Sequence, residues 1–252
     1  MFDLKGKVAV VTGGNGGIGL GMAQGLAAAG AQIVVAARNR EKSRAAATEI
    51  ERRGGTAIAI DVDVTSEASV DAMTKATMER LGRLDILVNN AGTNIRKPVH
   101  DLTLDEWRLV LDTNLTSAFL CSRAAYPAMK RAGGGKVINI GSMMSIFGAP
   151  FAPVYGASKG GIVQLTKSLA TTWARDNIQV NAVLPGWIDT ELTQKARREV
   201  PGLNEMVLRR TPAARWGVGE DMAGIAVFLA SSASDFITGT AIPVDGGFSI
   251  QV

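Results

Sequence analysis

The chain has 252 residues, of which 46% are hydrophobic and 20% are charged, as in ordinary globular proteins. Its formal net charge is +4, but the basic residues are dispersed and aromatic residues make up only 5%, which argues against a nucleic-acid-binding protein and favours attraction of a small anionic molecule. The single cysteine, Cys121, excludes an intrachain disulfide, and the single histidine, His100, excludes a histidine-rich metal site. We therefore expect no metal centre.

The chain start and the apolar runs favour a cytoplasmic protein. Residues 1–5 lack a basic region followed by an apolar one, so we expect no signal peptide. The longest apolar run, around residues 222–230, is too short to span a bilayer, so we expect no membrane association. We interpret Cys121 as a buried core thiol and His100 as a solvated loop residue.

The first elements are a strand, a glycine-rich loop and a helix. Residues 7–12 are a β-branched run suited to a buried strand, and Gly13-Gly-Asn-Gly-Gly-Ile-Gly19 follows at once. Residues 20–29 favour a helix. Glycines between a strand and a helix let the chain turn sharply and let a phosphate approach the amides at the helix start. This context predicts a dinucleotide-binding loop.

Strands and helices alternate along the remaining chain, without a repeat or a linker-like stretch. The next expected strands are 32–37, 56–60, 84–88, 135–140, 178–183 and 240–244. The next expected helices are 41–53, 66–82, 103–130, 154–175, 190–211 and 220–231, with a capping box at Thr103 and Glu106. The alternation predicts an α/β protein whose parallel sheet is covered by helices on both faces, in one domain over residues 1–252.

In such sheets the ligand site lies beyond the carboxyl ends of the strands. Gly13, Asn89, Ser142 and Pro185 each follow an expected strand directly. One topological rule therefore places all four on the same rim.

A phenol and an ammonium four residues apart, Tyr155 and Lys159, lie in the helix expected over 154–175. At this spacing both side chains project from one helix face. Lowering the pKa of a tyrosine from about 10 to about 7 takes about 4 kcal/mol, which a unit charge about 4 Å away supplies at an effective dielectric of about 20. The pair is thus suited to proton transfer near neutral pH. Taken alone, it would more often be part of a solvated helix face.

The end of the second strand bears on cofactor choice. An acidic residue there would bind the adenosine ribose and favour NAD, but this chain has Ala37 and then Arg38. A cation can instead pair with a 2′-phosphate. We therefore favour NADP(H), with NAD(H) as the alternative if Arg38 points to water.

Together these motifs resemble the short-chain dehydrogenase/reductase family, over nearly the whole chain from Lys7 to Gly247. The matching stretches are Thr12–Gly19, Asp63-Val64, Asn89-Asn-Ala-Gly92, Asn114, Ser142, Tyr155-Gly-Ala-Ser-Lys159, Pro185-Gly186 and Asp245-Gly-Gly247. The resemblance implies a three-layer, doubly wound Rossmann fold with a seven-stranded parallel sheet, and an oxidoreductase that interconverts a secondary alcohol and a ketone.

The resemblance also implies roles for individual residues. Tyr155 would be the general acid or base, Lys159 would lower the pKa of Tyr155 and hold the nicotinamide ribose, Ser142 would hydrogen-bond the substrate oxygen, and Asn114 would hold a water that links Lys159 to solvent. The implied cofactor contacts are Gly13, Asn15, Gly17, Ile18, Gly19, Arg38, Asp63, Val64, Asn90, Ala91, Gly92, Tyr155, Lys159, Pro185, Gly186, Ile188 and Thr190. The glycine loop lacks the basic residue that many NADP-dependent members carry there, so Arg38 alone supports the phosphate site. The side chains of 89–92 are interpreted as scaffold first, and Trp173 and Trp216 as packing residues.

The substrate is less defined. Residues 93–97, 141–145 and 215–217 resemble the gluconate 5-dehydrogenase and deoxygluconate dehydrogenase branch, which acts on sugar acids. The candidate substrate residues are Asn94, Arg96, Met143, Met144, Phe147, Trp187 and the segment of about 187–212. Arg96 could pair with a substrate carboxylate, or could be a solvated loop charge.

Three further expectations concern alternatives and assembly. The same residues suit a 3-oxoacyl thioester reductase or a reductase of bulky ketones. A non-catalytic dinucleotide-binding regulator would usually lack Tyr155 or Lys159, and both are present. The helices expected over 103–130 and 154–175, with small residues at Ala157, Gly160 and Gly161, resemble the family's main subunit contact and predict a homotetramer.

Overall fold

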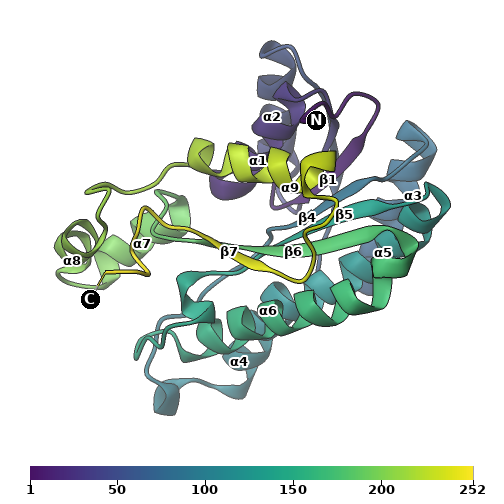
Figure 1. Cartoon of the computed structure of the whole chain (residues 1–252). Coiled ribbons are helices and arrows are strands. Elements are labelled where there is room, and N and C mark those ends of the chain that lie inside the picture. The colour runs from purple at the N-terminus through teal and green to yellow at the C-terminus, as the bar shows by residue number, and fades with distance from the viewer. Residues whose placement is uncertain (252) are drawn as a thin grey trace.

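The computed structural model describes residues 1–251 and contains a seven-stranded parallel sheet (Figure 1). The strands lie in the order β3-β2-β1-β4-β5-β6-β7, so the winding reverses between β1 and β4. Their bounds are β1 Val8–Thr12, β2 Gln32–Ala37, β3 Thr56–Asp61, β4 Ile86–Asn89, β5 Gly135–Ile140, β6 Ile178–Pro185 and β7 Ala241–Val244. The predicted fold class is confirmed, and every predicted strand is present within about two residues of its expected ends.

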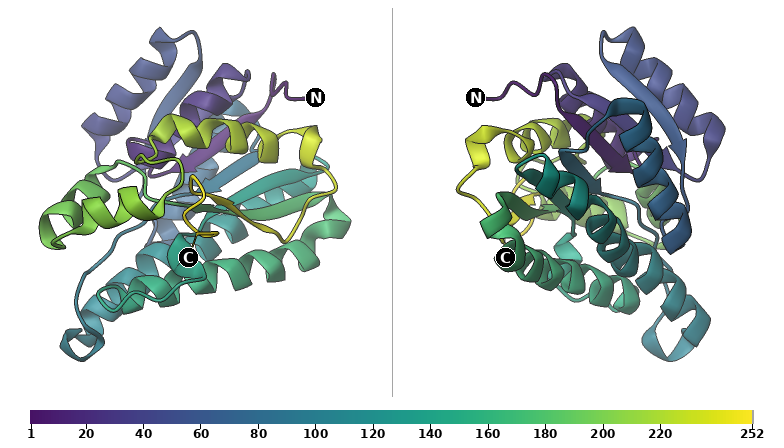
Figure 2. Two further views of the ribbon diagram at one scale, coloured as in Figure 1. Left: turned by 60° about the vertical axis from the view of Figure 1, so that its left-hand side comes forward. Right: turned by 90° about the vertical axis from the view of Figure 1, so that its right-hand side faces the viewer.

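Helices cover both faces of the sheet, as Figure 2 shows from two further sides. One face carries α1 Gly17–Ala28, α2 Arg40–Arg52 and α9 Ala223–Ala230. The other carries α3 Glu67–Leu81, α4 Leu104–Leu111, α5 Ser117–Arg131 and α6 Pro153–Trp173. Two short helices, α7 Glu191–Glu199 and α8 Leu203–Arg210, lie beyond the carboxyl end of β6 (Figure 1). Within residues 1–251, none of the helices combines the length and apolar character needed to cross a membrane.

The central strands are buried on both faces, and β1 shows why its sequence is almost wholly apolar. Val8 and Val10 belong to the core that α3 and α5 cover, whereas Ala9 and Val11 belong to the core under α1 and α9. All four side chains are fully buried. Because successive strand residues point to opposite faces, a strand between two helix layers must be apolar at every position. A fully buried valine contributes about 1.5–3 kcal/mol to the fold.

Two predicted helices are wrong as single elements. The helix expected over 103–130 is interrupted by a π-helical turn, Asp112–Thr116, in which the Ser117 N–H donates to the Asp112 carbonyl. The helical segment expected over 190–211 divides into α7 and α8, because Val200 is extended at the end of α7 and Gly202, the N-cap of α8, has a φ of 73°. Both interruptions lie at the carboxyl rim of the sheet, where the candidate site lies.

Residues interpreted as structural have structural surroundings. Cys121 is buried, and burial raises the pKa of its thiol to about 12. The ring of Trp173 stacks on Tyr126 with 4.9 Å between centroids, and Trp216 packs edge-on against Trp187. His100 lies exposed in a short 3₁₀ turn, Val99–Asp101.

Candidate active site

A cavity of about 570 Å³ lies beyond the carboxyl ends of the central strands. Gly13, Ser142 and Pro185 line it, as the topological rule predicts. Asn89 is buried and does not line the cavity, and its Nδ2 donates to Ser122 Oγ at 2.9 Å and to Asn139 Oδ1 at 2.8 Å. Asn89 therefore ties β4 to α5 and β5, in agreement with its interpretation as scaffold.

The glycine loop leaves the start of α1 open to an anion. The N-cap residue is Gly16, which has no side-chain oxygen to bind the first amides of the helix. Gly13 and Gly17 have φ values of 64° and 51°, which favour glycine. A Cβ at Gly17 would lie 2.8 Å from Cγ2 of Thr190, so the segment after β6 packs directly on the loop.

Asn90 braces the glycine loop from the neighbouring strand. Its Nδ2 donates to the carbonyls of Thr12 and Gly13, at 2.9 and 3.1 Å. A Cβ at Gly19 would lie 2.4 Å from Asn90 Nδ2 and from the Gly13 carbonyl oxygen. Gly19 is therefore required for packing and does not line the cavity, and its assignment as a cofactor contact stays a prediction.

All the other predicted cofactor contacts line the cavity. These are Gly13, Asn15, Gly17, Ile18, Arg38, Asp63, Val64, Asn90, Ala91, Gly92, Tyr155, Lys159, Pro185, Gly186, Ile188 and Thr190. At the end nearest β2 and β3, Asp63 accepts from the Thr65 backbone N–H at 3.0 Å and from its hydroxyl at 2.7 Å. These hydrogen bonds lower the pKa of Asp63. Arg38 stands at this same end.

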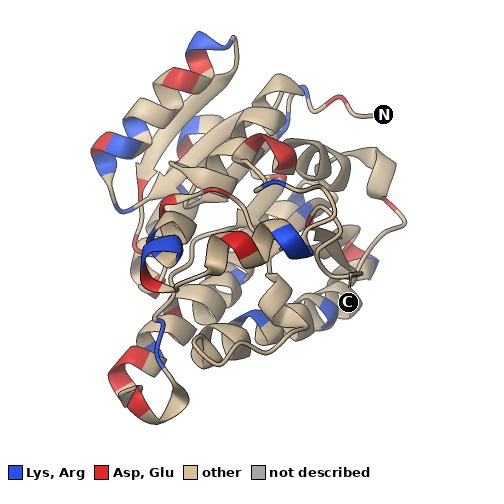
Figure 3. Ribbon diagram, turned by 90° about the vertical axis from the view of Figure 1, so that its left-hand side faces the viewer, with Lys and Arg blue, Asp and Glu red and all other residues tan. Residues whose placement is uncertain are grey.

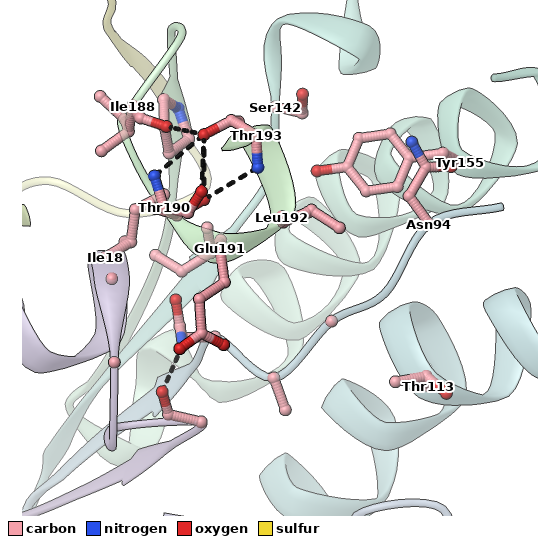
Figure 4. A pocket seen from close by; sticks show the side chains of 18 of the residues that line it. Ile18, Asn94, Thr113, Ser142, Tyr155, Ile188, Thr190, Glu191, Leu192 and Thr193 are labelled. Atoms are coloured by element: carbon pink, nitrogen blue, oxygen red, sulfur yellow. Dashed lines mark hydrogen bonds between the residues drawn. The ribbon is translucent and has the colours of Figure 1, made fainter. Parts of the chain in front are cut away.

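Tyr155 and Ser142 face the other end of the cavity (Figure 4). Burial raises the pKa of Tyr155, while hydrogen bonding by Ser142 and the charge of Arg96 oppose that shift. Lys159 Nζ lies 5.6 Å from the centroid of the Tyr155 ring and donates to the Ile140 carbonyl at 2.6 Å. Burial lowers the pKa of Lys159 to about 8. Desolvation outweighs both of these effects at Tyr155, and the lowering of its pKa by Lys159 stays a prediction.

A serine joins the two segments that carry these groups. The hydroxyl of Ser145 accepts from the Ser142 N–H at 3.2 Å and donates to the Lys159 carbonyl at 2.7 Å. The turn after β5 is thereby fixed against α6, which carries Tyr155. The relative positions of the Ser142 and Tyr155 hydroxyls are therefore set by the fold.

Asn114 is buried behind the cavity instead of lining it. Its Oδ1 accepts from the Thr93 N–H at 2.8 Å, and its Nδ2 donates to Ser158 Oγ and the Thr93 carbonyl, each at 3.0 Å. A Cβ at Gly92 would lie 3.3 Å from Asn114 Oδ1 and 3.8 Å from Lys159 Nζ. The π-helical turn thus places Asn114 next to Lys159, with its side chain engaged in holding the loop after β4.

Arg96 is not a solvated loop charge. Its side chain is only 9% exposed, with Nη1 3.1 Å from Glu199 Oε2 and Nη2 donating to the Leu192 carbonyl at 3.2 Å. Arg96, Asn94 and Trp187 all line the cavity. Within residues 1–251, Asn94 Oδ1 and Trp187 Nε1 are buried without a hydrogen-bond partner. Buried polar atoms of this kind are typical of a surface that receives a ligand.

The residues expected at the substrate end lie partly in the cavity lining and partly outside it. Met143 and Met144 line the cavity, but Phe147 does not, because its ring packs against Phe248 and beneath the guanidinium of Arg210. Glu191, Leu192 and Thr193 of the expected substrate segment also line the cavity, whereas sequence reasoning missed the lining residues Asn39, Lys42, Thr65 and Phe151. Lys42 could have been found, because it lies in the first turn of the helix expected over 41–53, close after Arg38.

The fold and the site define a dinucleotide-dependent oxidoreductase. Residues 13–249 match the family model described as enoyl-(acyl carrier protein) reductase. A 2-dehydro-3-deoxy-D-gluconate 5-dehydrogenase from Formosa agariphila is 42% identical over 248 residues, covering 98% of this chain and 94% of that protein. The 5-keto-D-gluconate 5-reductase of Escherichia coli is 40% identical over 252 residues, covering 100% of this chain and 99% of that protein.

Solved structures agree with these relatives. A crystal structure of a gluconate 5-dehydrogenase from Burkholderia cenocepacia, in complex with NADP and tartrate, has a TM-score of 0.94 at 40% identity and covers 100% of this chain and 98% of that chain. The chain therefore belongs to the short-chain dehydrogenase/reductase family, whose members are NAD(P)-dependent oxidoreductases. The family predicted from the motifs is confirmed.

Proposed function

We propose that this protein is an NADP(H)-dependent dehydrogenase that interconverts a secondary alcohol and a ketone of a sugar acid, such as gluconate or a deoxygluconate. One observation carries the proposal: a single cavity joins the Arg38 end to the Tyr155 hydroxyl and the Arg96 guanidinium. Two relatives that match this chain over nearly their whole length, at 40–42% identity, support the substrate class, because both are named for gluconate derivatives.

The residues present fit this cofactor. The uncapped amides at the start of α1 suit a pyrophosphate, and Gly17 allows close approach to the backbone. Asp63 and Val64 line the part suited to adenine, and Arg38 supplies a cation for a 2′-phosphate. The chemistry that bound NADP(H) supplies is hydride transfer. The chain itself must orient the substrate and move the proton.

Tyr155 is the proposed proton donor in ketone reduction. Burial raises its pKa, so the phenol is protonated at neutral pH and ready to donate. Ser142 donates a hydrogen bond to the same substrate oxygen, where negative charge develops. In alcohol oxidation the proton returns to Tyr155, and the charges of Lys159 and Arg96 stabilise the phenolate. Asn114 is proposed to support Lys159 from behind.

Replacing Tyr155 with Phe tests the proton transfer. We expect kcat to fall by about 10²–10⁴-fold while NADPH binding is retained, because only the hydroxyl is lost. Unchanged ketone reduction would overturn the role assigned to Tyr155. A loss of nothing but an already absent activity would favour a non-catalytic dinucleotide-binding protein.

Arg96 is the proposed partner of the substrate carboxylate. Arg96 pairs with Glu199, whose side chain is 39% exposed, so a substrate carboxylate can compete with Glu199 for the guanidinium. Arg96→Met should raise KM for gluconate by about tenfold or more, with a smaller change for an uncharged polyol. Lys97→Met is the matched control, since Lys97 pairs with Glu106 and does not line the cavity. Equal effects on both substrates would contradict the carboxylate role.

The apolar part of the wall favours a second candidate. Met143, Met144 and Trp187 line the substrate end and suit a bulky ketone or a 3-oxoacyl thioester. A panel of hexonates, ketones and a 3-oxoacyl thioester, each assayed with NADPH and NADH, separates these functions. Activity on ketones without activity on any hexonate would replace the sugar-acid proposal.

We also propose a homotetramer. The apolar side chains of Leu104, Leu109 and Phe119 are 60%, 50% and 43% exposed on α4 and α5. At Gly160 of α6, an added Cβ would meet nothing within 4 Å inside the chain, whereas at Gly161 it would meet Leu115. Gly160→Leu should therefore disturb assembly without disturbing the fold. Light scattering tests this, and a monomeric wild-type protein would refute the proposal.

A further inference from the structure

Lys42 lies at the Arg38 end of the cavity, in the first turns of α2. Both residues line the cavity, and a Cβ at Gly16 would lie 3.3 Å from Lys42 Cε and Nζ. The Lys42 N–H donates to the Oδ1 of Asn39, the N-cap of α2, at 2.9 Å. A cation therefore stands directly over the glycine loop, although the loop sequence itself contains none.

Three cations, Arg38, Arg40 and Lys42, gather at the N-terminus of α2. The helix dipole makes this end partly positive, so cations here are unfavourable unless an anion offsets them. Arg40 is offset by Asp61, with 2.9 Å between Nε and Oδ2. Lys42 is offset by Glu191, at 2.5 Å. Within residues 1–251, Arg38 has no ion pair in the structure. The cluster therefore has capacity for a further anion.

The ion pair between Lys42 and Glu191 is weak enough for another anion to replace the carboxylate. The side chains are 38% and 82% exposed, and exposed ion pairs contribute only about 0–1 kcal/mol. Figure 4 shows Glu191 on the side of the cavity near Ile18, away from Tyr155. Basic and acidic residues are interspersed over this side of the molecule, which carries α7 and α8 (Figure 3). A phosphate monoester, with more charge than a carboxylate, would compete well for Lys42.

We propose that Lys42 is a second cation that recognises the 2′-phosphate of NADP(H), and that Glu191 occupies it until that phosphate displaces the carboxylate. This proposal rests on the proposed use of NADP(H). Two cations, Arg38 and Lys42, then determine cofactor specificity. Glu191 is the first residue of α7, the helix that borders the substrate end. Binding of the 2′-phosphate therefore also breaks an ion pair of this helix.

The test measures binding of nucleotide fragments without turnover. Calorimetry gives Kd for 2′,5′-ADP, which carries the 2′-phosphate, and for 5′-ADP, which lacks it. Lys42→Met should weaken 2′,5′-ADP by about tenfold and leave 5′-ADP within about twofold. Arg44→Met is the matched control, because it removes the same charge from α2 at a residue that does not line this cavity. It should leave both Kd values unchanged.

A second variant tests the competition. Glu191→Gln should tighten 2′,5′-ADP by about two- to fivefold, and this gain should vanish in the Lys42→Met background. The proposal is overturned if Lys42→Met weakens binding of both nucleotides equally or of neither. It is also overturned if the tighter binding caused by Glu191→Gln persists in the double variant. If the wild type binds neither nucleotide, the proposed function itself fails. This outcome differs from failure of the Lys42 proposal, in which the wild type still binds nucleotide.

Discussion

Lys159→Met should change how stability depends on pH. The ammonium of Lys159 is 4% exposed, and it donates to the Ile140 carbonyl at 2.6 Å. Within residues 1–251, no carboxylate forms an ion pair with it in the structure. Burial lowers the pKa of Lys159 from 10.5 to about 8, so the folded protein releases this proton more readily than the unfolded chain does.

The sign follows from proton linkage. Between about pH 8 and pH 10.5 the unfolded chain retains a proton that the folded protein has lost, so the free energy of unfolding rises with pH. The slope approaches about 1.4 kcal/mol per pH unit, and the whole window amounts to about 3 kcal/mol. Methionine fills a similar volume without titrating. Between pH 7.5 and pH 9.5, the wild type should therefore gain about 2 kcal/mol relative to the variant.

Urea unfolding of both proteins at the two pH values measures this gain. Lys75→Met is the control, because the side chain of Lys75 on α3 is 77% exposed, and this variant should follow the wild type at both pH values. If the difference between wild type and Lys159→Met is the same at pH 7.5 and pH 9.5, burial does not set the ionisation of Lys159. The proposed effect of Lys159 on the ionisation of Tyr155 would then need a different physical explanation.

Two further predictions concern packing. Gly21→Ala should destabilise the protein by about 1–3 kcal/mol, measured by the shift in Tm, because a Cβ there would lie 1.9 Å from the Gly219 carbonyl oxygen. Gly224→Ala, with nothing within 4 Å of its Cβ, should instead stabilise α9 by up to about 1 kcal/mol, and equal shifts would contradict the contact. The buried thiol of Cys121, whose pKa is raised to about 12, should react with an aromatic disulfide reagent only as fast as the protein unfolds, and rapid labelling of folded protein would show exposure.

The fold was predictable because its strands are buried on both faces. In a parallel sheet between helix layers, each strand is a short apolar run bounded by turn residues, and β1 and β6 are of this kind. Such runs are visible in one sequence without any knowledge of contacts. The carboxyl rim then follows from topology, which is why Gly13, Ser142 and Pro185 could be placed together before the structure was known.

The π-helical turn could not be predicted in this way. Asn114 is held by Thr93 and Ser158, which lie 21 and 44 residues away along the chain, and local helix propensity contains no information about them. The break between α7 and α8 was easier to predict from the sequence, since Pro201 and Gly202 form a dipeptide typical of turns.

The ionisation of Tyr155 shows a second property that the sequence alone does not determine. The sequence shows that Lys159 is four residues away, and a nearby cation favours the phenolate. The structure adds that both groups are buried, which raises the pKa of Tyr155 and lowers that of Lys159. Burial depends on the whole fold, so the sequence identifies candidates for proton transfer but does not show how burial shifts their pKa values.

The ion pairs of α7 lead to a last prediction, coupling between cofactor and substrate. Glu191 pairs with Lys42 at one end of the helix, and Glu199 pairs with Arg96 near the other, about 12 Å along a straight helix. Each proposed ligand group competes with one of these carboxylates, so losing one ion pair should make the other easier to lose. We expect 2′,5′-ADP, but not 5′-ADP, to tighten gluconate binding by about two- to fivefold.

The same coupling must hold in reverse. Gluconate should tighten 2′,5′-ADP binding by an equal factor, because a coupling free energy between two sites is reciprocal. Glu191→Gln should remove the effect in both directions, since the ion pair at the start of α7 is then already absent. Calorimetric titration of each ligand in the presence of the other measures both factors. Independent binding in the wild type would show that α7 does not transmit the charge of the cofactor to the substrate end.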